Sequence, residues 1–248
     1  MKSIKTLFIL LAVAMVAPMQ AQDDMTAEQV IENYLETVGG ADAWNNIKGM
    51  KTTGVYNMQG MEIPYTEYRF TDGRMATEID LSGNKMVWAA YDGETFWQRN
   101  QMTMLAEKSD AEATENMKKQ IGDFPSPFLN YKDKGYTVEL LGSDTVDGTE
   151  CYKIQLTKLP IMVNGEEQVN AVIYYFDKEN FVPIIEESAI PIGPMAGQKV
   201  RSTIGNYQEV DGLYFAFENG NDMMSSMVKD IELNPEVDDS VFAMPKDN

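Results

Sequence analysis

The chain has 248 residues and a formal net charge of −19, with 39 acidic residues against 20 lysines and arginines. So acidic a surface repels nucleic acid and anionic membranes, and we exclude both as direct partners. The chain contains no histidine and one cysteine, Cys151. This excludes histidine-dependent nucleophilic catalysis, a thiolate metal centre and an internal disulfide.

The first 21 residues have the pattern of an export signal. Two lysines precede an apolar run over 7–16, which has the length of a signal-peptide core and is too short to span a membrane. No later apolar stretch is long enough to cross a bilayer, and no cysteine near Ala21 could carry a lipid anchor. The sequence predicts a signal peptide over 1–21, a single exported domain over 22–248 and no transmembrane segment.

Residues 26–38 are predicted to form an amphipathic helix. Thr26 and Gln29 make a capping-box pattern, and apolar residues then recur at helical spacing. The pair Gly39-Gly40 ends this helix, and a short helical turn is expected over 41–46.

Tight turns divide most of the remaining chain into strands. Four Asp-Gly and two Asn-Gly pairs lie between segments rich in Thr, Val, Ile, Tyr and Phe. Both central residues of such turns can take positive φ, which favours antiparallel hairpins. The predicted strands lie at 49–59, 62–71, 74–81, 85–91, 95–101, 136–142, 150–158, 168–176, 181–189, 198–208, 213–219 and 223–233.

The stretch "WAAYDGETFWQRN" at 88–100 places Asp92 and Glu94 among aromatic residues. It could be an acidic active site or a tight turn between strands. The same Asp-Gly turn occurs elsewhere in the chain, so we interpret Asp92 as a turn residue and Glu94 as the start of the next strand. The case for an acidic active site is correspondingly weak.

A second helix is expected over 109–121. It opens with Ser109 and Asp110 and closes with Lys118 and Lys119, charges that suit the helix dipole. Its apolar side is thin. An irregular link follows it, and the apolar residues of the C-terminal tail are expected to hold that tail against the fold.

Two central strands, over 85–91 and 171–176, do not alternate between apolar and polar residues. Such strands are covered on both faces, by helices or by an apolar ligand. Many of the 18 methionines lie beside tyrosines, phenylalanines and tryptophans of the early strands, which suggests an adaptable apolar lining. The apolar loop "AIPIGPMAG" at 189–197 is a candidate flap or docking surface.

Chemistry-bearing motifs are scarce. No glycine-rich phosphate loop, G-x-S-x-G elbow or calcium loop occurs, and neighbouring carboxylates in strands point to opposite faces. We therefore predict no enzyme activity, no catalytic residue, no cofactor and no metal site.

The chain resembles the outer-membrane lipoprotein-sorting proteins of LolA/LolB-like fold found in Bacteroidetes-type bacteria. The resemblance covers nearly all of 22–248 and rests on the order of segments such as "YLETVGGADAWNNIKGMKTTGVYNMQGME", "YDGETFW", "VDGTECYKI", "NYQEVDGLYFAF" and "IELNPEVDDSVFAMP". It implies an unclosed, strongly curved antiparallel half-barrel with an N-terminal helix and a mid-chain lid helix, around a cavity for acyl chains. It also implies an arginine that helps to hold the lid shut, for which Arg69 is the best match.

These observations predict a non-catalytic periplasmic carrier for lipoprotein acyl chains or other lipids, with envelope proteins as possible partners. Two alternatives remain open: an envelope protein-interaction module without lipid cargo, and a carboxylate-based hydrolase. The residues expected to line the cavity or its lid are Tyr56, Met58, Met61, Tyr65, Tyr68, Arg69, Phe70, Trp88, Phe96, Trp97, Met102, Met104, Met117, Ile121 and Phe124.

Overall fold

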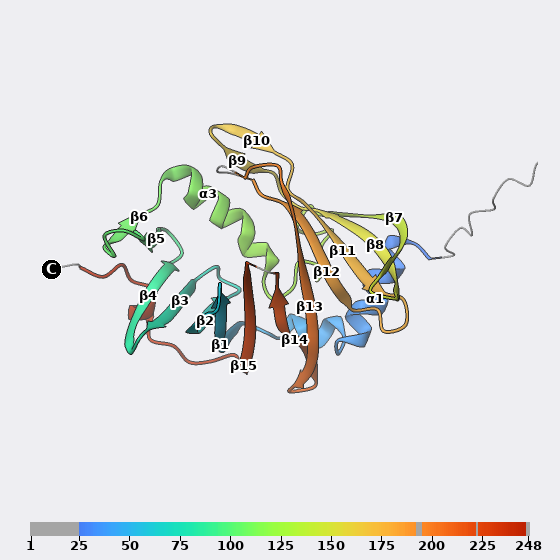
Figure 1. Ribbon diagram of the computed structural model, residues 1–248, viewed down its shortest axis with the longest axis horizontal. Coiled ribbons are helices and arrows are strands. Elements are labelled where there is room, and N and C mark those ends of the chain that lie inside the picture. The colour runs from blue at the N-terminus through green and yellow to red at the C-terminus, as the bar shows by residue number, and fades with distance from the viewer. Residues whose placement is uncertain (1–24, 192–194, 222, 247–248) are drawn as a thin grey trace, which may run out of the picture.

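The computed structural model describes residues 25–191, 195–221 and 223–246, and most of them lie in β-strands (Figure 1). The predicted signal peptide over 1–21 lies outside the described residues, as does part of the loop 189–197. Within the described ranges, no helix is both long enough and apolar enough to span a membrane.

One antiparallel sheet dominates the architecture. Its edge strands, β6 and β7, do not meet, which confirms the predicted unclosed antiparallel sheet. Among the described residues it comprises, in spatial order, β6 (Ala106–Lys108), β5 (Phe96–Arg99), β4 (Asn84–Tyr91), β3 (Met75–Leu81), β2 (Met61–Phe70), β1 (Gly49–Met58), β15 (Met224–Leu233), β14 (Leu213–Gly220), β13 (Lys199–Val210), β12 (Pro183–Ala189), β11 (Ala171–Asp177), β8 (Thr149–Thr157) and β7 (Thr137–Val146).

The turn chemistry works as the sequence predicts. Asp147 and Asp211 both adopt positive φ and are each followed by a glycine with positive φ. Asp92 accepts hydrogen bonds from the backbone amides of Glu94 and Thr95, at 2.9 and 2.8 Å. Its carboxylate therefore stabilises a turn, as expected.

Five helical segments accompany the sheet among the described residues: α1 (Ala27–Thr37), α2 (Ala41–Asn45), α3 (Ala111–Gln120) and the 3-10 turns η1 (Ile121–Asp123) and η2 (Asp239–Val241). The predicted capping box is present, with Thr26 and Gln29 each bonded to the other's backbone amide. The carboxylate of Asp110 accepts a hydrogen bond from the third residue of α3.

Two features differ from the predicted elements. The short edge strand β6 was not expected. The predicted strand at 168–176 is also divided: β9 (Ile161–Val163) and β10 (Glu166–Gln168) form a separate two-stranded sheet, and β11 begins at Ala171. The turn Asn164-Gly165 makes this small hairpin possible, because both residues have positive φ.

One face of the sheet, here called the helix face, carries the main core. The buried stripe of α1 and the segment after η1 pack on the half of the sheet that runs from β15 to β7, including Ile154 of β8, Phe176 of β11 and Phe215 of β14. Phe128 fixes this contact, with its ring centroid 5.6 Å from Tyr34 and 5.4 Å from Phe176.

The opposite face, here called the tail face, is covered by the C-terminal segment over β2–β5. Phe242 is 1% exposed and packs with Ala76, Ala90 and Trp97. Figure 1 shows this red segment returning past β1–β4 after β15. The predicted anchoring of the tail is confirmed. On the same face, Cys151 of β8 is fully buried and packs with Tyr175 and Ile185.

Candidate functional site

A polar clasp joins α3 to the β9–β10 hairpin above the sheet (Figure 1). Glu112 accepts hydrogen bonds from the two backbone amides of the hairpin turn, at 3.0 and 2.7 Å. Asn116 exchanges two hydrogen bonds with the backbone of Met162, at 2.7 and 2.8 Å. Lys119 donates to the carbonyl of Pro160 at 2.7 Å. These three side chains share one side of α3 because they are four and three residues apart.

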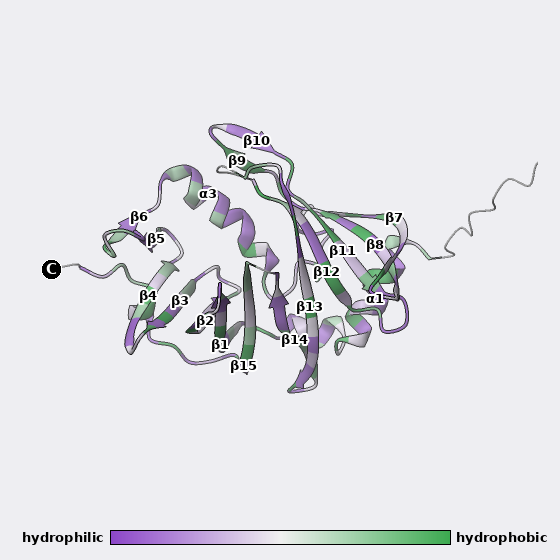
Figure 2. Cartoon of the chain, in the orientation of Figure 1, coloured by the Kyte–Doolittle hydropathy of each residue, from purple (hydrophilic) through white to green (hydrophobic). Residues whose placement is uncertain are grey.

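A groove of about 420 Å³ lies between the hairpin, the end of α3, the start of β11 and the end of β12. In Figure 2, β9 is hydrophobic and β10 hydrophilic, so the hairpin is amphipathic. Val169, which follows the hairpin, is 80% exposed at the groove's rim. The apolar residues of the groove include Ile161, Val169, Val172, Ala189, Ile190 and Pro191.

The inner end of the groove is charged and internally paired. Lys158 lines the groove and lies 2.7 Å from the carboxylate of Asp123, and both side chains are less than one-fifth exposed. Tyr136 donates a second hydrogen bond to Asp123 at 3.0 Å. Burial raises the pKa of Glu186, and the positive charge of Lys158 partly offsets this shift. An apolar ligand that reached the inner end of the groove would therefore meet the charged pair of Lys158 and Asp123, here called the polar floor.

The end of α3 closes directly on the helix face beside β2. The guanidinium carbon of Arg69 lies 5.7 Å from the centroid of the Phe124 ring. Together with Met117 and Ile121, these residues line a space of only about 10 Å³. Gly73 allows Ile121 to pack close to the sheet, because a Cβ at position 73 would lie 2.6 Å from the Ile121 side chain.

Six of the predicted site residues share the helix face, judged from strand register: Tyr56, Met58, Met61, Tyr65, Arg69 and Phe96. Tyr56 stacks on Tyr65 with ring centroids 4.0 Å apart, and the Tyr65 hydroxyl lies 2.9 Å from that of Ser226. Burial raises the pKa of both tyrosines. The six residues share a face without forming one site: Met61 lies eight positions along β2 from Arg69, at the other end of the strand, Met58 pairs with it, and neither methionine lines the groove or the space beside Phe124.

Three other predicted lining residues, Tyr68, Phe70 and Trp97, pack instead with the C-terminal tail. Trp97 is fully buried and donates a hydrogen bond from its indole to the carbonyl of Phe242 at 2.9 Å. Neighbouring residues of a strand point to opposite faces, so the side chains of Tyr68 and Phe70 leave β2 on the face opposite Arg69. Phe70, at the end of the strand, also borders the small space beside Arg69 and Phe124. That these three residues line an acyl cavity stays a prediction.

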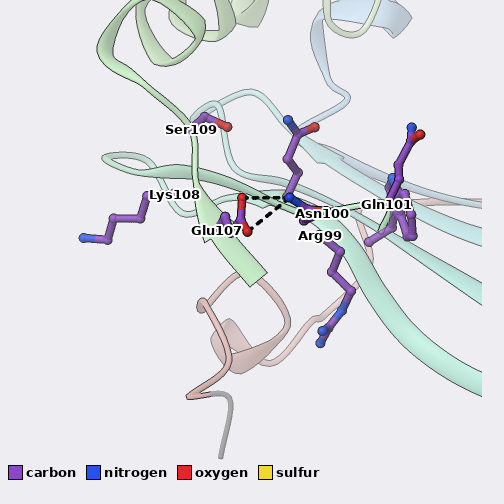
Figure 3. A pocket seen from close by; sticks show the side chains of 8 residues that line it. Arg99, Asn100, Gln101, Glu107, Lys108 and Ser109 are labelled. Atoms are coloured by element: carbon purple, nitrogen blue, oxygen red, sulfur yellow. Dashed lines mark hydrogen bonds between the residues drawn. The ribbon is translucent and has the colours of Figure 1, made fainter. Parts of the chain in front are cut away.

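The remaining predicted residues lie near the far edge of the sheet. Met102 is 94% exposed in the β5–β6 turn, and the carbonyl of Met104 accepts a hydrogen bond from Arg99 at 2.6 Å. Trp88 lines a polar pocket of about 290 Å³. Figure 3 shows this pocket, where Asn100 donates to the carboxylate of Glu107. These residues do not meet the groove.

Sequence reasoning missed most of the groove itself. The sequence predicts strands over 150–158 and 168–176 and no strand between them, where β9 lies, and it singles out only the neighbouring loop 189–197. The signal that could have found the groove is the Asn164-Gly165 pair, because a hairpin turn at this point requires two short strands before 171.

No family model matches the sequence, and no curated protein matches it. Solved structures do resemble the fold. A LolA superfamily protein from Nitrosomonas europaea has a TM-score of 0.53 and 15% identity, over 88% of this chain and 98% of that one. A DUF1329 family protein from Desulfovibrio piger has a TM-score of 0.51 and 14% identity, over 88% of this chain and 97% of the other. The chain therefore has the fold of the LolA superfamily.

Proposed function

We propose that this protein is a non-catalytic periplasmic carrier that holds the acyl chains of a lipid or lipoprotein in the groove beneath α3 and the β9–β10 hairpin. The observation that carries the proposal is the groove of about 420 Å³ on the helix face of a LolA-like sheet. This volume lies within the usual range for small-molecule sites. The proposal includes export by the signal at 1–21 and a single domain over 22–248.

The lid helix, α3, is held to the sheet by few buried apolar contacts. No residue of α3 is fully buried, whereas α1 buries Ala27, Val30, Ile31 and Tyr34. Helices with few buried apolar contacts open at low free-energy cost. We propose that α3 and the hairpin open together as one flap, with the contact between Arg69 and Phe124 holding its sheet-side end closed.

Apolar burial would supply the affinity. Each methylene moved from water into the groove contributes about 0.8 kcal/mol, so a partly inserted acyl chain needs few polar contacts. The apolar walls from Ile161 to Val172 and from Ala189 to Pro191 would contact the chain, and the polar floor at Lys158 would limit its depth.

The test is native mass spectrometry of the protein purified from its exporting host without detergent. We expect a mass excess that disappears on denaturation, with acyl species in the extract. A clean unliganded mass, with no uptake of a fluorescent fatty acid, would contradict the carrier and favour a protein-interaction module.

A matched pair of variants tests the groove. Val172 and Ile173 are neighbours on β11, both half-buried, but only Val172 lines the groove. Val172→Asp should abolish the mass excess and Ile173→Asp should retain it. Equal retention by two folded variants would place the cargo elsewhere.

A further inference from the structure

Three exposed methionines stand side by side on adjacent strands at one end of the helix face. Met58 of β1 lies directly opposite Met61 of β2 and directly opposite Met224 of β15. Their exposed fractions are 44%, 60% and 43%. Directly paired residues project from the same face, so the three side chains form one line, here called the methionine row.

The backbone fixes this row. Met58 and Met61 flank the turn Gln59-Gly60, in which both residues have positive φ and the amide of Gly60 bonds to the Asn57 side chain at 3.1 Å. On the other side, the amide of Met224 donates to the Asn221 side chain at 3.2 Å. The row is therefore held by two tight turns.

The next row on the same face consists of Ile63, Tyr56 and Ser226, which are also paired across the three strands. Tyr56 and Tyr65 stack there. This ordered layer supports the methionine row from the side nearer the core. The row lines none of the pockets described above, so an inference about it is independent of the acyl carrier.

From this geometry we propose that the methionine row binds one soft monovalent metal ion, Cu(I) or Ag(I), through three thioether sulfurs. Thioethers are soft ligands that select Cu(I) over harder divalent ions. Adjacent paired Cβ atoms lie about 5 Å apart, and methionine has three rotatable bonds. The outer two side chains can therefore lean over Met58 until all three sulfurs face one ion.

The sequence predicts no metal site, because it contains no histidine and one cysteine, and the three methionines meet only through the pairing of β1 with β2 and β15. A thioether carries no proton, so binding should persist at pH 5, where carboxylate and imidazole sites weaken. The acidic surface would add attraction for any cation.

The test uses protein labelled with ¹³C at the methionine methyl groups and titrated with Ag(I) in chloride-free buffer. We expect the methyl signals of Met58, Met61 and Met224 to shift together and saturate at one equivalent, at pH 7 and at pH 5. Met227 is a control on the same strand, because it is 57% exposed but pairs with Val55 on the opposite face. Its signal should stay unchanged at one equivalent.

Replacing the methionine row with leucines gives a second test of the metal site. Met58→Leu/Met61→Leu/Met224→Leu should weaken Ag(I) binding by more than about 100-fold, more than the loss seen when an outer-shell partner of a metal ligand is removed. Met102→Leu/Met227→Leu should leave it unchanged. Equal shifts of all exposed methionines, no shift at one equivalent, or unchanged affinity in the triple variant would overturn the proposal. Acyl-chain binding should be the same in both variants, so the two proposals can fail separately.

Discussion

At the scale of single residues, the C-terminal tail depends on Phe242. Its ring is buried against Trp97, and its carbonyl accepts the indole hydrogen bond. Phe242→Ala should lower the free energy of unfolding by about 3–5 kcal/mol, because it empties a filled site. Urea denaturation would measure this loss. Acyl-chain uptake should survive, since the tail and the groove lie on opposite faces; a loss below about 1 kcal/mol would mean that the tail is not part of the cooperative fold.

Arg69 can be compared with Arg201, which makes the same kind of contact on the other face of the sheet. Arg69 lies over the ring of Phe124 beside the end of α3, whereas the guanidinium carbon of Arg201 lies 4.8 Å from the ring centroid of Tyr175 on the tail face. A cation–π contact of about 1 kcal/mol corresponds to a severalfold change in rate. Arg69→Met should therefore speed release of a fluorescent fatty acid severalfold in stopped-flow measurements, and Arg201→Met should not. Equal rates in the two variants would remove Arg69 from the proposed closure.

Lys134 makes the stability depend on pH. Burial lowers its pKa to about 8, and its ammonium donates to the carbonyl of Ser126 at 2.8 Å. An unfolded lysine titrates near 10.4, so between about pH 8 and 10 the unfolded chain holds more protons than the folded one. In that window this group makes the free energy of unfolding rise with pH, and below pH 8 its cost is constant.

The variant Lys134→Met isolates this contribution. Its free energy of unfolding relative to wild type should be highest near pH 7 and should fall as the pH approaches 10, because only the wild-type protein then gains stability from this group. Urea denaturation at several pH values measures the difference, in which the tyrosines common to both proteins cancel. A difference independent of pH would mean that Lys134 titrates normally.

At the scale of elements, the clasp between α3 and the hairpin should control opening. Asn116→Ala removes both hydrogen bonds to Met162 and leaves the buried stripe of α1 untouched. We expect faster amide hydrogen exchange over 111–120 and 161–168, with the free energy of global unfolding changed by less than about 1 kcal/mol. Glu115→Ala is the control, because Glu115 pairs with Lys118 of the same helix and not with the hairpin over 161–168. Unchanged exchange in Asn116→Ala would mean that the hairpin is held in another way.

Helix starts and turns were predictable from the sequence where residues close together in the chain determine them. The capping box of α1 and the Asp-Gly turns depend on neighbours in the chain, and both are present. The short strands β6 and β9 have three residues each, too few for a periodic pattern to emerge. Which face each strand buries was also beyond the sequence, because each of two register shifts leaves one residue unpaired: Lys229 of β15, opposite Thr53/Gly54, and Trp88 of β4, opposite Thr77/Glu78. An unpaired residue of this kind reverses the alternation of the strand that contains it.

At the scale of the whole molecule, the two halves of the sheet are covered on different faces. α1 packs on the helix face of the half that contains β8 and β11, and the tail packs on the tail face of β2–β5. On the helix face beside β2 and β3, Met117 of α3, Ile121 of η1 and Phe124 lie next to Arg69, and α3 buries no side chain fully. The aromatic residues assigned to one cavity from the sequence are thus divided between a core and a face beneath a lid.

This division predicts how cargo should affect stability. A ligand that binds only the folded state at 100 times its Kd adds about 2.7 kcal/mol, and for a domain of this size each kcal/mol raises Tm by about 2–4 °C. Protein stripped of lipid and then given a long-chain fatty acid should therefore melt about 5–10 °C higher than the stripped protein in scanning calorimetry. Val172→Asp should show no such rise, while Ile173→Asp should. A rise in both variants would locate the acyl chain under α3 on β1–β4, outside the groove at β11 and β12, and no rise in the stripped wild-type protein would remove the carrier itself.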